Sequence, residues 1–189
     1  MTIQTESLYS PLEERMIGSF AWTAEEAVAV DDDGILAATS LATTAMDITE
    51  FDAQPACTRL LTLKTTGTAG DVKAGKIKVF GTNINGEPIS EEVSLTADTA
   101  LNATTARAFK TVEKVACPAM DGSGVKLKIG WADKYGLPFI SDKEVLMYSI
   151  ENGAVATAAT ITADAELAKN VVAFHTASNG KSREIVVLC

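Results

Sequence analysis

Apolar and polar residues alternate along the middle of the chain, and this pattern predicts β-strands. It is clearest over residues 75–82 and 125–130, where branched apolar residues alternate with lysines. Successive side chains of a strand point to opposite faces of a sheet, so such alternation is typical of a strand with one buried face. Five strands are therefore expected in this region, over residues 59–65, 75–82, 88–95, 108–116 and 125–130.

Three Asn-Gly pairs separate apolar runs, at residues 85–86, 152–153 and 179–180. Asparagine and glycine tolerate the positive φ angles that both central residues of a type I′ hairpin turn require. No amphipathic helical pattern lies between successive strands of the middle region, which argues against an α/β fold. The sequence therefore predicts an all-β protein, an antiparallel sandwich or small barrel with an irregular N-terminal arm.

The chain divides into three regions. Residues 1–55 form the arm, in which weaker patterns predict strands over 27–30 and 35–41. Residues 56–140 form the sandwich core. Residues 141–189 form a C-terminal β-hairpin region that either completes this sandwich or makes a small subdomain. The strands expected in this last region cover residues 144–150, 155–162, 171–176 and 183–188.

The arm contains few large apolar residues, and these are expected to contact a partner. A capped helix over Pro11–Ile17 would present Leu12 and Met16 on one side, as in helices that bind a groove. Phe20 and Trp22 follow shortly after. Full burial of such side chains stabilises by about 1.5–3 kcal/mol each. We expect the arm to dock on a partner or a neighbouring subunit, and the alternative is that it folds back over its own sandwich.

Composition narrows the classes of partner. The 189 residues carry a net charge of −9, which argues against binding to a nucleic-acid backbone. No apolar run is long enough to span a membrane, and the N-terminus lacks the pattern of a signal peptide. Aromatic residues make up only 6% of the chain, so the core is expected to rest on aliphatic side chains.

The three cysteines, Cys57, Cys117 and Cys189, are widely spaced. Their odd number and their spacing predict neither a disulfide framework nor a zinc site. Cys57 and Cys117 are expected to be buried as small apolar residues. Cys189, as the last residue, is a candidate for a disulfide between neighbouring subunits.

Candidate catalytic residues are scarce. The only histidine, His175, stands in a predicted strand, where a residue at the sheet surface or in an interface is expected. The chain lacks a nucleophile elbow, a phosphate-binding loop and a dinucleotide-binding motif. The acidic run 31–34 lacks the distal glutamate of a calcium loop and is expected to be a solvated turn. The sequence thus predicts a non-enzymatic protein with no catalytic, cofactor-binding or metal-binding residues.

The densest aromatic group lies at the end of the middle region and includes Trp131, Tyr135 and Phe139. Tryptophan and tyrosine often carry the binding energy of protein interfaces. These residues either close one end of the sandwich core or contact a partner, and both interpretations stay open.

Three segments, 81–92, 108–112 and 133–138, are similar to a known family, the last with the sequence Asp-Lys-Tyr-Gly-Leu-Pro. In them the chain resembles small β-rich structural proteins of tailed bacteriophages. The resemblance covers residues 57–140 and continues weakly toward the C-terminus. It transfers no functional residue to this chain.

The resemblance implies a virion component made in the cytoplasm of the host bacterium, such as a capsid decoration protein that binds the major capsid protein. Such a protein is expected to self-associate as a trimer or ring through exposed strand edges and the aromatic group. A tail-tube, tail-tip or fibre-base protein is the alternative within the virion. A carbohydrate-binding module, with Trp131 and Tyr135 as the sugar platform, is the alternative of another class.

Overall fold

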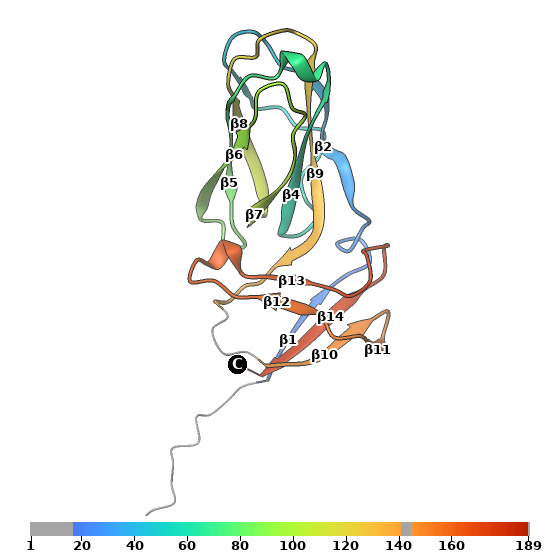
Figure 1. The fold of residues 1–189 in the computed structure, drawn as a ribbon. Coiled ribbons are helices and arrows are strands. Elements are labelled where there is room, and N and C mark those ends of the chain that lie inside the picture. The colour runs from blue at the N-terminus through green and yellow to red at the C-terminus, as the bar shows by residue number, and fades with distance from the viewer. Residues whose placement is uncertain (1–16, 141–144, 189) are drawn as a thin grey trace, which may run out of the picture.

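The computed structural model describes residues 17–140 and 145–188, and it confirms the all-β class (Figure 1). Its helical segments within these ranges are two short 3-10 turns, η1 (Ala69–Asp71) and η2 (Leu167–Lys169). No helix in the described ranges is long and apolar enough to cross a membrane. The strands are β1 (Ile17–Trp22), β2 (Asp31–Ser40), β3 (Met46–Ile48), β4 (Arg59–Gly67), β5 (Gly75–Thr82), β6 (Pro88–Leu95), β7 (Asn102–Phe109), β8 (Thr111–Cys117), β9 (Val125–Gly136), β10 (Val145–Glu151), β11 (Ala154–Ala156), β12 (Thr160–Thr162), β13 (Val171–Ala173) and β14 (Arg183–Leu188).

The upper part of the molecule in Figure 1 is a sandwich of two antiparallel sheets, called here the large sandwich. One sheet contains β2, β9, β4 and β7, and the other has the order β3-β8-β5-β6. Between them lies a core made mainly of aliphatic side chains, as the composition predicts. Leu61, Ile77 and Ile129 are fully buried there, and burial of each contributes about 1.5–3 kcal/mol to folding.

Below it lies a second, smaller unit, called here the small sandwich (Figure 1). Its outer sheet has the order β1-β14-β10-β11, and its other layer contains β12, β13 and the end of β9. Trp22, Tyr135, Val172 and Ile185 meet in a separate core between these layers. The C-terminal strands thus build a second core together with β1, while β12 and β13 also extend the sheet that contains β9, β4 and β7.

Both sandwiches share the strand β9. One edge of β9 pairs with β4 from Val125 to Tyr135, while the other edge pairs first with β2 and then with β13. The side chains of Val125 and Ile129 point into the large core, and that of Tyr135 points into the small core. The register between β9 and β4 shifts between Trp131 and Tyr135. This irregularity lies where β9 leaves one core for the other, which is a common place for a bulge.

The region predicted as an irregular arm joins both sandwiches from Ile17 onward. β1 pairs with β14 in the small sandwich, whereas β2 and β3 pair with β9 and β8 in the large one. Residues 27–30, expected to form a strand, instead connect β1 to β2. Of the helix predicted over Pro11–Ile17, residues 11–16 lie outside the described residues, and Ile17 begins β1. Pairing with strands far along the chain decides these elements, and local propensity does not contain that information.

The acidic run expected to be a solvated turn is the beginning of β2. Asp32 accepts a hydrogen bond from Lys64 at 2.6 Å, and Asp33 accepts one from Lys128 at 2.7 Å. Lys128 stands on β9, which pairs with β2, and Lys64 stands on β4, the next strand of the same sheet. Cross-strand ion pairs of this kind allow an acidic segment to join a sheet. The local sequence does not reveal these pairings.

The three Asn-Gly pairs form three different turns. Asn152 and Gly153 have φ angles of 51° and 79° and join β10 to β11 as a type I′ hairpin. At residues 85–86 only Gly86 has a positive φ, because the side chain of Asn83 accepts backbone hydrogen bonds and organises a longer turn. Gly180 joins no hairpin, and its N–H donates to a carbonyl in the connection between β1 and β2.

Two predicted strands are each split in two. Residues 108–116 contain the end of β7 and most of β8, which belong to opposite sheets of the large sandwich. Lys110 makes the turn between them, and its N–H donates to the carbonyl of Thr82 at 2.8 Å. Residues 155–162 likewise contain parts of β11 and β12, which belong to different layers of the small sandwich. Apolar periodicity continues across both corners, so it does not reveal them.

We expect Gly130→Ala to destabilise the protein by about 2 kcal/mol or more. A Cβ atom at Gly130 would lie 1.7 Å from the carbonyl oxygen of Asp31, so β2 would have to move away from β9. Gly70→Ala is the matched control, because a Cβ atom there meets nothing within 4 Å. Urea unfolding followed by circular dichroism measures both. Equal stability of the two variants would contradict the close packing of β2 on β9.

Candidate functional site

The aromatic residues predicted as partner contacts meet in the small core. Phe20 and Phe139 have ring centroids 4.8 Å apart, and Trp22 and Tyr135 have ring centroids 5.1 Å apart. Trp22 is 7% exposed and Tyr135 is fully buried. Residues of the predicted arm and of the predicted aromatic group thus form one cluster within this chain. Trp22 and Tyr135 are core residues, since apolar rings are strongly stabilised by burial against each other.

Trp131 lies apart from that cluster. Its half-buried ring packs against the large core, and its indole N–H donates to the carbonyl of Ala29 at 2.9 Å. Trp131 and Tyr135 therefore belong to different cores, although both stand on β9. Because Tyr135 is buried, its ring cannot join Trp131 in the sugar platform that the carbohydrate-binding alternative would need.

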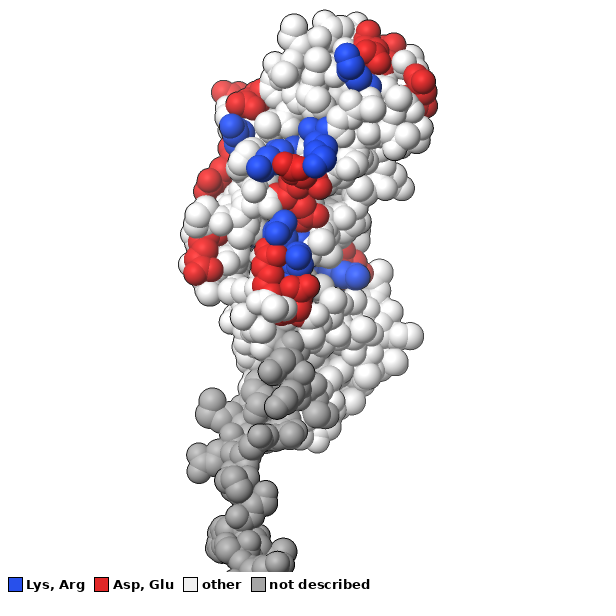
Figure 2. Space-filling view, turned by 60° about the vertical axis from the view of Figure 1, so that its left-hand side comes forward, with Lys and Arg blue, Asp and Glu red and all other residues white. Residues whose placement is uncertain are grey.

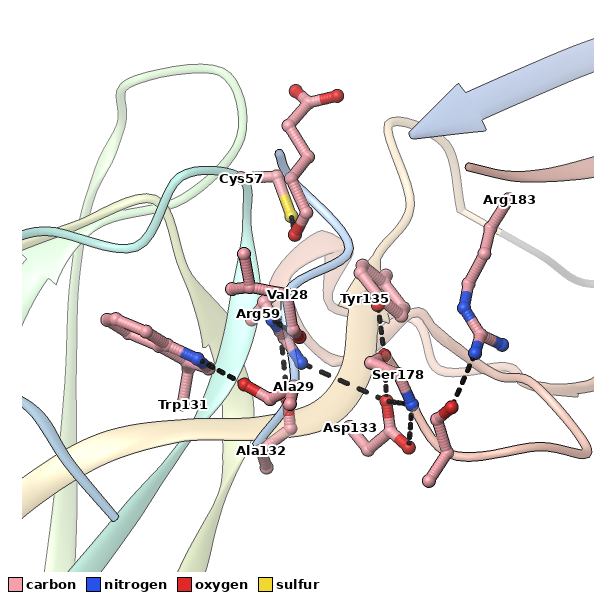
Figure 3. A network of polar contacts seen from close by, with 12 residues as sticks. Val28, Ala29, Cys57, Arg59, Trp131, Ala132, Asp133, Tyr135, Ser178 and Arg183 are labelled. Atoms are coloured by element: carbon pink, nitrogen blue, oxygen red, sulfur yellow. Dashed lines mark hydrogen bonds and ion pairs between the residues drawn. The ribbon is translucent and has the colours of Figure 1, made fainter. Parts of the chain in front are cut away.

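A buried arginine lies at the junction of the two sandwiches (Figure 3). Arg59 is 1% exposed, and its guanidinium donates to the carbonyls of Ala132 and Val28, each at 2.9 Å. It lies 3.8 Å from the carboxylate of Asp133 and 4.8 Å from the centre of the Tyr135 ring. A buried charge is tolerated only when it is paired and hydrogen-bonded, so Arg59 fixes the positions of all these groups.

Asp133 continues this network toward the C-terminal region. Ser178 donates its backbone N–H at 2.9 Å and its hydroxyl to the Asp133 carboxylate. Because a hydroxyl has only one proton, Tyr135 must donate in the hydrogen bond that it shares with Ser178. Burial raises the pKa of the Tyr135 phenol, so it remains a donor near neutral pH. The network thus links β4, β9 and the loop before β14.

A second buried arginine, Arg183, holds the same loop from the other side. It is 1% exposed and donates to the carboxylate of Glu151 and the carbonyl of Thr176, each at 3.0 Å, and to the carbonyl of Ala177 at 2.7 Å. Its guanidinium lies 4.9 Å from the centre of the Phe174 ring. Arg183 therefore joins β10 and β14 to the loop that carries Ser178.

A bidentate ion pair joins the two sandwiches at another point. Arg107 on β7 donates through Nε and Nη2 to the two carboxylate oxygens of Glu166, beside η2. Arg107 also donates to the carbonyl of Ser90 at 3.0 Å. The hydrogen bonds from Arg107 hold the pKa of Glu166 below its usual value. Bidentate pairs have a defined geometry, so this contact limits how the sandwiches can move.

The burial of both arginines was not predicted from the sequence, although strand alternation contains a signal for it. Alternation places Arg59 on the same face as Leu61, and Arg183 on the same face as Ile185. A charged residue in phase with buried positions of a strand is either at an edge or buried with partners. The partners themselves come from distant segments, so no local pattern identifies them.

A groove of about 580 Å³ runs beside β1 at the junction. β1 forms one wall with Phe20 and Trp22, and residues 54–58 are among the other lining residues. The lining is mainly apolar, with Glu26 and Lys110 supplying one charge of each sign. Among the described strands β1 pairs only with β14, so its other edge has no strand partner in this part of the chain. An open strand edge beside an apolar groove can bind an extended segment.

The thiol of Cys57 lies in this groove and is poorly reactive. It donates a weak hydrogen bond to the carbonyl of Glu26 at 3.5 Å, and burial raises its pKa to about 12. The thiolate is the reactive form, so Cys57 is protonated at neutral pH. Burial also raises the pKa of Cys117 to about 12. These two residues therefore act as apolar packing groups.

Four predicted residues remain, and the structure describes one of them. Leu12, Met16 and Cys189 lie outside the described residues. His175 is exposed. Among residues 17–140 and 145–188, no group of three histidine, cysteine or acidic side chains could hold a metal ion.

On the face that Figure 2 shows, charged side chains gather over the upper and middle parts of the molecule, and the white lower part that grey residues leave visible shows none. Most lysines of the large sandwich form ion pairs with acidic residues. Lys76, for example, lies 2.7 Å from Glu92. Because the basic side chains are neutralised in this way, this face has no continuous basic patch of the kind that a nucleic-acid backbone needs.

No protein-family model matches the chain, and neither a curated protein nor a solved structure matches it.

We expect Asp133→Ala to destabilise the protein by about 2–3 kcal/mol. The substitution removes the acceptor for two donors of Ser178 and the carboxylate beside the buried Arg59. Asp47→Ala is the matched control, because Asp47 forms an exposed ion pair with Lys114 at 3.3 Å and should cost no more than about 0.5 kcal/mol. Chemical unfolding measures both changes. A loss at Asp133 no larger than that at Asp47 would show that the junction network is not stabilising.

Proposed function

We propose that the protein is a structural component of a tailed-bacteriophage virion and binds a virion partner through the groove beside β1. Two observations support this proposal. The sequence resembles small structural proteins of such phages, and the groove combines an open strand edge with apolar walls. The proposed binding depends on the groove, because an open strand edge with apolar walls can accept an extended segment of another protein.

Strand addition at β1 explains how such a groove would bind. Backbone hydrogen bonds along the open edge supply affinity, while the walls select side chains. Phe20 offers an apolar surface, and Glu26 and Lys110 offer a charge of each sign. The expected partner segment is therefore extended and mainly apolar, with charged residues that complement Glu26 and Lys110.

The major capsid protein is the partner that we favour, which makes this chain a capsid decoration protein. A capsid presents its subunits in many copies, so individually weak contacts add up when the bound chains also contact one another. A tail-tube, tail-tip or fibre-base protein remains the alternative within the virion. A carbohydrate-binding module is less well supported, since Tyr135 is buried and cannot offer its ring to a sugar.

The N-terminal residues and Cys189 belong to this proposal as predictions. Leu12 and Met16 precede β1 in the sequence and would dock on a partner or a neighbouring subunit. Because β1 is part of the small sandwich, a deletion that tests this role must end at residue 16. Cys189 would form a disulfide between subunits of assembled particles.

Mass spectrometry of separated heads and tails, purified from the phage that encodes the protein, tests the proposal. We expect the protein in the head fraction, in amounts comparable to a regular lattice component. Its presence only in the tail would favour the alternative within the virion. Its presence in infected cells but in no particle would overturn the structural role.

A matched pair of variants tests the groove in the same particles. Ala56 is exposed and lines the groove, whereas Ala53 is exposed in the same segment but does not line it. We expect Ala56→Trp to fill the groove and weaken attachment to particles that lack the protein by at least roughly tenfold, and Ala53→Trp to leave it unchanged. Melting curves check that both variants fold. Equal attachment of the two would exclude the groove as the binding site.

A further inference from the structure

The outward face of the sheet β1-β14-β10-β11 carries two rows of mainly apolar residues. One row runs across the sheet through Ala21, Glu184, Ile150 and Val155, and the other through Ser19, Val186 and Tyr148. The residues that alternate with them on β1 and β14, such as Trp22 and Ile185, face the small core. Strand alternation therefore gives this sheet two apolar faces, as is typical of a sheet covered on both sides.

One of these faces is open to solvent within the described part of the chain. Val155 is 76% exposed, Tyr148 is 50% exposed, and Met147 beside it is 40% exposed. Among residues 17–140 and 145–188, the other exposed large apolar residues are Val30 and Ile140, so three of the five lie on this sheet. A contiguous apolar surface of this kind marks an interaction site.

Charge identifies the kind of partner that this face fits. The chain has a net charge of −9, so two copies repel each other wherever acidic residues meet. The face carries a single carboxylate in its two rows, Glu184, which accepts a hydrogen bond from Ser19 at 2.5 Å. Two copies can therefore approach through this face with little repulsion.

The shape of this face also fits a second copy of the chain. Val155 protrudes from the sheet, and a hollow of about 140 Å³ lined by Ala21, Ile150 and Glu184 lies near it. A two-fold axis places the same patch of both copies in contact, so the protrusion of one copy can enter the hollow of the other. We propose that this face binds a second copy of the chain, with the two sheets packed face to face.

The face is small for an interface between two copies. Its strands contain 6, 6, 7 and 3 residues, which at about 4.8 Å between strands and about 3.3 Å per residue give roughly 350 Å² per copy. The total of roughly 700 Å² is below the 1,200 Å² or so of stable complexes. The free chain is therefore a weak dimer, and a lattice that holds many copies side by side strengthens the contact.

Sedimentation equilibrium of the purified full-length chain tests this interface, and it needs neither a capsid nor the groove. We expect a reversible dimer. Val155→Lys should weaken it at least roughly tenfold, because the ammonium group would be buried against the partner sheet. Val30→Lys is the matched control, since Val30 is 45% exposed but lies in the connection between β1 and β2, and it should leave the dimer unchanged.

A third variant should strengthen the dimer instead of weakening it. Glu184→Gln removes the one carboxylate that the dimer would desolvate, so it should tighten association by roughly threefold or more. The proposal is overturned if the chain remains monomeric up to about 200 µM, a concentration at which even weak complexes form. It is also overturned by a dimer that responds equally to Val155→Lys and Val30→Lys, or by one that Glu184→Gln weakens. Because the virion partner is absent from this experiment, its result is independent of the proposed function.

Discussion

Both cores of this protein depend on the pairing of one strand, β9. β4 follows β9 through the large sandwich and across the junction, and this continuity brings Arg59 into the interior between the two cores. The guanidinium then needs partners, and it finds them in the carbonyls of Val28 and Ala132 and in Asp133. The polar network at the junction is thus a consequence of extending one strand pair through two cores.

The two surfaces with which we associate function follow from this arrangement. The groove has lining residues from both sandwiches, for instance Phe20 from the small one and Thr111 from the large one. It keeps its shape because Arg59 and the ion pair between Arg107 and Glu166 limit movement at the junction. The outward face of the small sandwich, by contrast, contains strands far from β9 and is free to contact another copy.

The sequence predicts best those elements whose signal is local. β5 and β6 have the bounds expected from alternation and turn residues, because each strand carries its own period. β1 and the beginning of β2 were not expected, since their stability comes from β14, β4 and β9. Arg59 and Arg183 were missed for the same reason, because their partners lie on other segments. The aromatic residues are conspicuous in the sequence, but only the fold shows that Trp22 and Tyr135 meet.

The two tryptophans provide the most direct test of the shared strand, because Trp22 lies in the small core and Trp131 packs against the large core. In the variants Trp22→Phe and Trp131→Phe, the remaining tryptophan reports one sandwich, and circular dichroism reports the whole chain. If β9 couples the cores, fluorescence and circular dichroism give the same urea midpoint within each variant. Midpoints that differ by more than about 0.5 M within one variant would show that the two sandwiches unfold independently.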